Sequence, residues 1–218
     1  MTRLAIFGAT GYAGTHIITE ASDRGHDVVA ITRGTGTIPQ VGNVNNRTGT
    51  LYDRSFVLDV TAATDVLICA IPARPDAAGH TLVDATPHLV DASRQHGIRI
   101  AVVGGASSLL LSPGGEMVFS TLKDVLPPEL ITELTCHMRF LDALRATPAH
   151  VDWFYLSPPQ EFGAHVPGEK LGHYRTGGDV LLRDDSGRSA ISGSDYATAF
   201  LDEIDNPKHP RQRFTVAY

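Results

Sequence analysis

The sequence predicts an α/β protein with a central parallel sheet, and three observations support this fold class. A glycine-rich turn at residues 8–14 joins an apolar run to a helical pattern. Further apolar runs then alternate with segments of helical periodicity along most of the chain, as in proteins built from parallel strands and covering helices. One run, residues 65–70, is apolar on both faces, which is typical of a buried parallel strand.

Composition limits the classes of protein that the chain can belong to. Its 218 residues, 42% hydrophobic and 19% charged, predict a single globular domain, residues 1–218, with a sizeable core. A net charge of -6 argues against a nucleic-acid partner. The apolar runs are too short to span a membrane, and the chain starts directly in a strand, so we expect no membrane association and no signal peptide.

The two cysteines, Cys69 and Cys136, lie in apolar stretches and are expected to be buried free thiols of a reducing compartment. We therefore expect a cytoplasmic protein. Its expected partner is a small-molecule substrate, and the sequence leaves monomer and homodimer open.

The glycine turn predicts a binding site for a dinucleotide. It follows an apolar strand at residues 4–7 and opens a helix at residues 12–24. Gly8 permits the tight turn, Gly11 lets the backbone approach a pyrophosphate, and Gly14 lets the helix pack close to the strand. The helix N-terminus adds free N–H groups and a positive dipole end. The alternative is a purely structural tight turn.

The end of the second predicted strand, residues 27–32, indicates which dinucleotide is preferred. An acid about 20 residues past the last glycine holds the ribose hydroxyls of NAD, whereas an arginine suits the 2′-phosphate of NADP. Arg33 stands at this place, and there is no acid between Asp27 and Asp53. The sequence therefore favours NADP(H) over NAD(H). The alternative is that Arg33 is an ordinary solvated loop charge.

The other elements are predicted in chain order from periodicity and capping residues. They are a third strand near residues 48–51, a helix capped by Asp53, strands at 65–70 and 100–103, a helical segment at 79–96 that Pro87 kinks or restarts, a helix at 127–145, a strand at 151–156, a helix at 195–205 and a strand at 212–216. From residue 160 glycine-rich loops predominate, which predicts a small C-terminal substrate lobe with residues 160–192 as its lid. No histidine spacing matches a metal site.

Two groups are candidates for proton donation. Ser107 and Ser108 follow the strand at residues 100–103, at the sheet edge where α/β proteins bind ligands. Their hydroxyls are candidates for polarising a carbonyl or for binding the nicotinamide amide. The alternative is that they belong to an ordinary serine-rich loop. His137 lies in a leucine stripe and is predicted to point inward. It is either a satisfied interior group or a general acid. The leucines of the stripe are Leu130, Leu134, Leu141 and Leu144.

Five stretches carry a family resemblance, and they occur in the family's order along nearly the whole chain. They are residues 8–14, 102–108, 152–158, 172–179 and 194–197. In these stretches the chain resembles the atypical short-chain dehydrogenase/reductase group, and in particular the NAD(P)H-binding, NmrA-like proteins described as NADH-flavin reductases.

The resemblance implies a doubly wound Rossmann sheet and a set of cofactor-binding residues. The pyrophosphate residues would be Gly8, Thr10, Gly11, Tyr12 and Ala13. The residues bordering the adenosine half would be Leu51, Ala70 and Ile71. Those near the nicotinamide would be Gly104, Ser157 and Pro158.

The chain also departs from the group. Short-chain dehydrogenases carry Tyr-x-x-x-Lys on the helix after the fifth strand, but residues 129–145 contain neither tyrosine nor lysine. Thr50 stands where the family has an adenine-side Asp. Two functions follow: an NADPH-dependent reductase of a small planar acceptor, flavin- or quinone-like, or a non-catalytic NADP-binding regulator. The sequence does not name the substrate.

Overall fold

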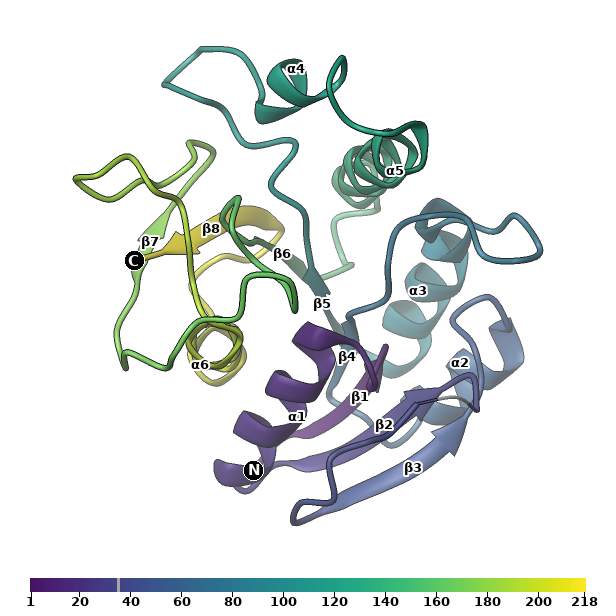
Figure 1. Ribbon diagram of the computed structural model, residues 1–218. Helices are drawn as coiled ribbons and strands as arrows, with labels where there is room; N and C mark the ends of the chain where they lie inside the picture. The colour runs from purple at the N-terminus through teal and green to yellow at the C-terminus, as the bar shows by residue number, and fades with distance from the viewer. Residues whose placement is uncertain (35) are drawn as a thin grey trace.

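The computed structural model describes residues 1–34 and 36–218, and within them the sheet has eight strands. The strands are β1 (Arg3–Phe7), β2 (Asp27–Thr32), β3 (Val44–Thr48), β4 (Val66–Cys69), β5 (Arg99–Val103), β6 (Trp153–Ser157), β7 (Arg175–Gly177) and β8 (Gln212–Ala217). Their spatial order is β3-β2-β1-β4-β5-β6-β8-β7 (Figure 1). β7 pairs antiparallel with β8, and the pairs from β3 to β8 are parallel.

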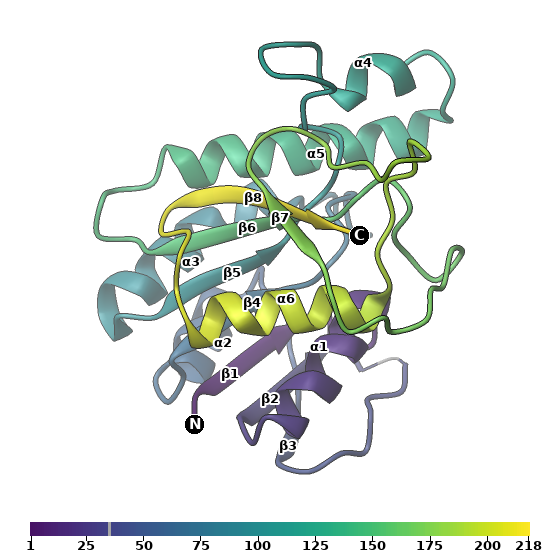
Figure 2. The same cartoon turned by 90° about the vertical axis from the view of Figure 1, so that its left-hand side faces the viewer.

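Helices cover both faces of the sheet. They are α1 (Tyr12–Asp23), α2 (Arg54–Thr61), α3 (Leu82–His96), α4 (Val118–Leu122), α5 (Pro128–Arg145) and α6 (Gly193–Asp205). Two views show α1 and α6 on one face and α2, α3 and α5 on the other (Figures 1 and 2), and each face has its own apolar core. The predicted doubly wound parallel sheet is confirmed. The strand order reverses between β1 and β4, where such sheets bind ligands.

Several predicted local features are confirmed. The Asp53 carboxylate caps α2 by accepting from the backbone N–H groups of Ser55 and Phe56. Cys69 and Cys136 are both buried and form no disulfide within the described chain.

Other boundaries differ from the prediction for identifiable reasons. The third strand lies at Val44–Thr48, not at 48–51, because β3 is a polar edge strand without an apolar pattern. α3 begins at Leu82, where Thr81 and Asp84 form a capping box, and it neither ends nor restarts at Pro87.

The predicted leucine stripe of α5 is wrong at its first member. Leu130 is 46% exposed, while Cys136, Phe140, Leu141 and Leu144 are the helix's buried residues. Position 35 belongs to the loop predicted after Arg33, and that part of the prediction lies outside the described residues.

The segments that follow β5 and β6 are joined to each other. Leu109, Val118 and Leu181 form a small apolar cluster, and Leu110 bridges to Val180 through backbone hydrogen bonds. The buried Asp195 carboxylate at the start of α6 accepts from the backbone N–H groups of residues 171 and 172. The segment 160–192 is therefore held by two contacts, one with the loop after β5 and one with the start of α6. Its role as a substrate lid stays a prediction.

Candidate functional site

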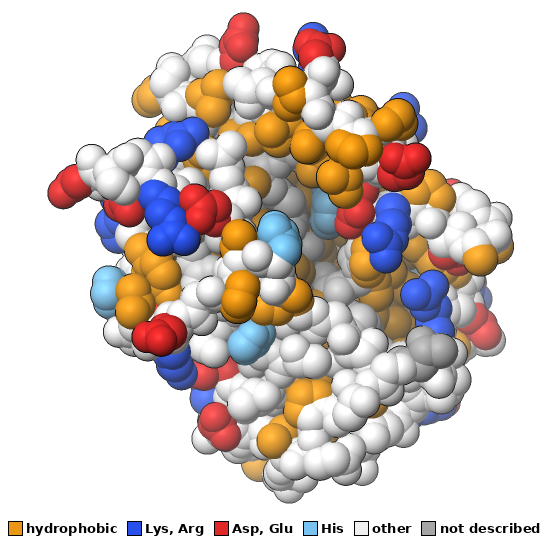
Figure 3. Space-filling model, viewed as in Figure 1, with side chains coloured by type: hydrophobic (Ala, Val, Ile, Leu, Met, Phe, Trp, Pro, Cys, Tyr) orange, Lys and Arg blue, Asp and Glu red, His pale blue; other side chains and the backbone are white. Residues whose placement is uncertain are grey.

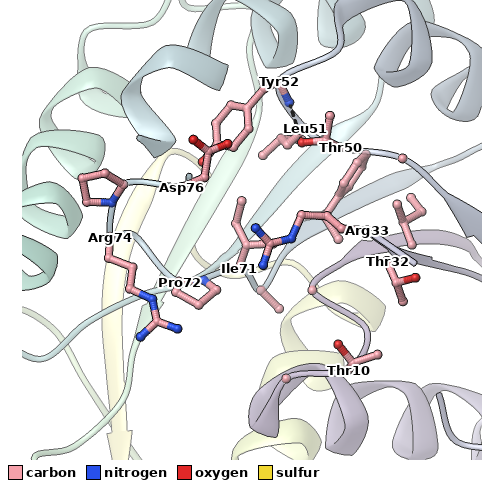
Figure 4. A pocket seen from close by; sticks show the side chains of 17 residues that line it. Thr10, Thr32, Arg33, Thr50, Leu51, Tyr52, Ile71, Pro72, Arg74 and Asp76 are labelled. Carbon is pink, nitrogen blue, oxygen red and sulfur yellow. Dashed lines mark hydrogen bonds between the residues drawn. The ribbon is translucent and has the colours of Figure 1, made fainter. Parts of the chain in front are cut away.

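A cavity of about 220 Å³ opens at the carboxyl ends of β1, β2 and β4, where the strand order reverses (Figure 4). Seven of the predicted cofactor-binding residues line it: Gly8, Thr10, Gly11, Arg33, Leu51, Ala70 and Ile71. Thr50, which stands where the resemblance places an acid, lines it too. The fold thus brings together the turn after β1 and the end of β4, which are about 60 residues apart in sequence.

The glycines of the turn are required by close backbone packing. Gly8 has φ +89°, and a Cβ there would lie 2.3 Å from the carbonyl oxygen of Ala70. A Cβ at Gly14 would lie 2.1 Å from the carbonyl oxygen of Gly8. Both contacts are too short for any real side chain, so these glycines hold α1 and β4 against the turn.

The N-terminus of α1 suits an anion. Gly11 is its N-cap and has no side chain to bond the first-turn N–H groups, and that turn carries no acid. These N–H groups therefore stay available beside the cavity, together with the positive end of the helix dipole. A pyrophosphate fits this arrangement.

Arg33 supplies positive charge at the end of β2. Its exposed side chain extends across the cavity, and Arg74 stands on another wall (Figure 4). The acid of the cavity, Asp76, lies beside Tyr52, and its carboxylate already accepts from the N–H groups of Ala78 and His80 at 2.9 Å. The end of β2 therefore presents a cation without a competing acid.

Tyr52 and Arg74 were missed by sequence reasoning. Tyr52 is placed by long-range packing, since its ring stacks on that of His80 with 4.9 Å between centroids. Neither residue belongs to a recognisable motif, so periodicity and spacing carry no signal for them.

The side chain of Tyr12 turns away from the cavity. Its hydroxyl accepts a hydrogen bond from the backbone N–H of Gly193 at 3.0 Å, and its ring packs edge-on against Phe162. Ala13 is buried. Only the backbone N–H groups of these two residues are therefore suited to bind phosphate.

A second group of residues lies where β5, β6 and α5 meet. Figure 3 shows that the face seen in Figure 1 is hollowed between the C-terminal segments and the helices on the other side. Gly104 leaves room for the buried ring of Tyr155, which a Cβ would meet at 2.1 Å, and His137 packs on Gly105. The Tyr155 hydroxyl accepts from the Gly105 N–H at 2.9 Å and lies 3.3 Å from His137 Nδ1.

Burial sets the charge of this pair. It lowers the pKa of His137 to about 4 and raises the pKa of Tyr155 well above its ordinary value. Near neutral pH the imidazole is therefore uncharged and the phenol keeps its proton.

The two candidate serines point in different directions. The Ser107 hydroxyl donates to the carbonyl of Leu134 on α5 at 3.4 Å. The Ser108 hydroxyl accepts from Arg213 at 3.2 Å, and that guanidinium also binds the carboxylate of Asp179. Each serine thus already has a side-chain hydrogen bond to a different element.

The predicted nicotinamide-side residues lie at the carboxyl ends of the central strands. Ser157 ends β6 and Pro158 follows it, and both are buried. The Ser157 hydroxyl is an unsatisfied polar group, without a hydrogen-bond partner among the described residues. Gly104, Ser157 and Pro158 are not part of the cavity wall described above. Their contact with a nicotinamide therefore stays a prediction.

These features are those of a dinucleotide-binding Rossmann protein. The sequence model of the NAD(P)H-binding family matches residues 8–207, and the chain belongs to this family. An uncharacterized protein of Bacillus subtilis, YwnB, is 32% identical over 98% of this chain and 97% of its own length.

Solved structures of similar proteins have the same fold. A proposed exported protein from Burkholderia pseudomallei is 33% identical, with all of both chains covered and a TM-score of 0.81. A proposed NADH-flavin reductase from Streptococcus pneumoniae is 27% identical, covers 100% of this chain and 99% of its own, and has a TM-score of 0.77. In the described part of this chain, the helices are all too short or too polar to cross a bilayer.

Proposed function

We propose that the protein is an NADPH-dependent oxidoreductase that transfers hydride to a small planar acceptor, flavin- or quinone-like. The observation that carries the proposal is the pairing of two sites along the carboxyl edge of one sheet. One is the uncapped α1 N-terminus with Arg33, and the other is the His137–Tyr155 pair beside β5 and β6. The similar Streptococcus protein, itself a proposed NADH-flavin reductase, supports the reaction class.

The preference for NADPH rests on Arg33. Its guanidinium at the end of β2 is a bidentate donor that suits a 2′-phosphate, and the acid that would bind the ribose hydroxyls of NAD is absent there. The backbone of residues 10–13 would bind the pyrophosphate. Leu51, Ala70 and Ile71 would border the adenosine half.

NADPH, when bound, supplies the hydride. The protein orients the nicotinamide against the acceptor, excludes water and stabilises charge that develops on the acceptor. His137, Ser107 and Ser108 are the candidate donors to the acceptor. A flavin or quinone, once reduced, takes its proton from water, so the reaction does not require the missing Tyr-x-x-x-Lys acid.

The experiment follows NADPH absorbance with panels of flavins, quinones and carbonyl compounds. We expect turnover with flavins or quinones and less with simple carbonyl compounds. Binding of NADPH and NADH is measured in parallel by calorimetry. Turnover restricted to carbonyl compounds would contradict the proposed acceptor class, and absence of nucleotide binding would contradict the whole proposal.

A non-catalytic NADP-binding regulator is the second candidate. The observation that favours it is that α5, which spans Pro128–Arg145, carries neither the tyrosine nor the lysine that short-chain dehydrogenases use. Tight NADPH binding without turnover in all three panels would favour this function.

A further inference from the structure

We propose that Tyr155 is a positioning residue that holds His137 in a single neutral tautomer, with its Nε2–H directed to the acceptor of the hydride. The inference deepens the proposed function and rests on it. It assigns a role to a phenol that comes from β6, not from the helix where the resembling enzymes carry theirs.

The hydrogen bonds around the phenol fix the direction of its proton. The Gly105 N–H donates to the Tyr155 oxygen at 2.9 Å, so this contact uses a lone pair and not the hydroxyl proton. Within the described residues, the acceptor in reach of that proton is His137 Nδ1, at 3.3 Å. If Nδ1 instead carried the proton, the Tyr155 O–H would be buried without an acceptor, which costs about 1–3 kcal/mol.

The surroundings of the ring leave Nε2 as its free polar atom. The Cβ, Cγ and Cδ2 side of the imidazole lies against Gly105. Nδ1 faces Tyr155, and within the described residues this is the hydrogen bond that the imidazole makes. His137 is only partly buried, and its Nε2 is not among the fully buried polar atoms that lack a partner in the described residues, so this edge of the ring is the one open to a ligand.

A neutral Nε2–H acts as a hydrogen-bond donor, not as an acid. As hydride arrives from NADPH, the acceptor gains two electrons and negative charge develops on one of its oxygen or nitrogen atoms. The Nε2–H donates to that atom and keeps its proton, and water then protonates the product. This chemistry fits an acceptor whose reduced form is stable as an anion, such as a quinone or a flavin.

The first test measures the tautomer directly. Nitrogen-15 NMR of the unliganded protein distinguishes protonated from unprotonated ring nitrogens, and the His137 signals are assigned by their absence in His137→Gln. We expect an unprotonated Nδ1 and a protonated Nε2 in the natural protein. In Tyr155→Phe, which keeps the ring beside Gly104 but lacks the hydroxyl, we expect the tautomers to become mixed or inverted. A protonated Nδ1 in the natural protein, or no change in Tyr155→Phe, overturns the inference.

The second test separates positioning from stability. Tyr196 is an equally buried tyrosine, and its hydroxyl donates to the Leu156 carbonyl on the same strand at 2.8 Å, so Tyr196→Phe is a matched control. We expect kcat to fall at least tenfold in Tyr155→Phe, with the Kd for NADPH within twofold of the natural value. In Tyr196→Phe we expect kcat to stay within threefold. Equal kcat values in the two variants contradict the positioning role.

The two tests distinguish this inference from the proposed function. The NMR result needs neither cofactor nor acceptor. If the natural protein fails to bind NADPH, the proposed function fails while the tautomer measurement still decides the role of Tyr155.

Discussion

The cavity at the end of β1 and the group of residues at the end of β6 are built from different kinds of atoms. Around the cavity the decisive contacts are made by backbone, since the missing Cβ atoms of Gly8 and Gly14 let the turn touch β4 and α1. Around His137 the decisive contacts are made by side chains, through the Tyr155 hydroxyl. The two places lie along the carboxyl edge of the same sheet.

The difference shows which kind of substitution each place tolerates. A backbone cradle tolerates almost no substitution at its glycines but depends little on the side chains around it. The hydrogen bond of a side-chain pair, in contrast, is lost when a single hydroxyl is removed, and the fold stays intact. The proposed cofactor end, at the cavity, is therefore constrained by packing, and the proposed acceptor end, at His137, is constrained by hydrogen-bond geometry. Five substitutions, three of them with matched controls, test this contrast.

The largest effect is expected for Gly8→Ala. The new Cβ would collide with the Ala70 carbonyl at a backbone φ of +89°, so we expect a loss of about 3 kcal/mol or more in the free energy of unfolding and no measurable NADPH binding. Gly25→Ala is the matched control, because Gly25 also has positive φ but open space around it, and we expect a loss of about 1 kcal/mol. Chemical denaturation measures both values, and similar losses would contradict the packing argument.

If Gly8→Ala does not fold, Gly11→Ala tests the same cradle. The backbone of Gly11 is extended, and the nearest atom to a new Cβ is the Gly8 carbonyl oxygen at 3.3 Å. We expect a folded protein whose NADPH affinity falls at least tenfold. Unchanged affinity would contradict the binding of pyrophosphate at this turn.

The next effect concerns pH and the acceptor end. The pKa of His137 is about 4 in the folded protein and about 6.5 when unfolded, so the unfolded chain binds the proton more strongly. The free energy of unfolding should therefore rise between pH 4 and pH 6.5, by up to about 3 kcal/mol, and be lost again as pH falls. Urea denaturation across this range should show that His137→Gln has lost this slope. His80→Gln, at a more exposed histidine, is the control and should keep it.

A smaller and selective effect is expected for Arg33→Ala. Loss of charge-assisted hydrogen bonds should weaken NADPH binding by roughly 1–3 kcal/mol and leave NADH binding unchanged. Arg74→Ala, which removes the other arginine of the cavity, should not discriminate between the two cofactors. Isothermal calorimetry with both nucleotides decides this, and an equal loss of both in Arg33→Ala would exclude contact with a 2′-phosphate.

The smallest effect is expected for Ser108→Ala. The hydroxyl accepts one hydrogen bond from Arg213, so its removal should change the free energy of unfolding by less than about 1 kcal/mol and the kcat by less than threefold. A fall of tenfold or more in kcat would instead identify Ser108 as the donor to the acceptor.

The same contrast explains what the sequence could predict. The turn at residues 8–14 was predictable because its strand, glycines and helix are adjacent in the chain, and Arg33 was found by its spacing from Gly14. Gly8, Thr10 and Gly11 of the turn line the cavity together with Arg33. The apolar strands were predictable for the same local reason. The edge strand β3 was predicted at the wrong residues, because its side chains are mostly polar and exposed and give no apolar pattern.

The acceptor end was only partly predictable. His137 was singled out by the face of α5 on which it lies, although Leu130 of the same stripe is exposed. Tyr155 gave no signal, since it stands within the apolar strand Trp153–Ser157 as any core residue would. Its partners are 18 and 50 residues away: the parallel pairing of β5 with β6 brings Gly105 to it, and the packing of α5 on the sheet brings His137.

Cys69, at the end of β4 next to the cavity residue Ala70, has a consequence for the chemical durability of the protein. A thiolate close to a quinone would add to its ring and be permanently alkylated. Complete burial raises the pKa of the Cys69 thiol to about 12, so almost none of it is ionised at neutral pH, and its sulfur is out of reach of an electrophile. The fold thus places a nucleophilic atom next to the cavity residue Ala70 and keeps it inert toward the quinone-like acceptor proposed above.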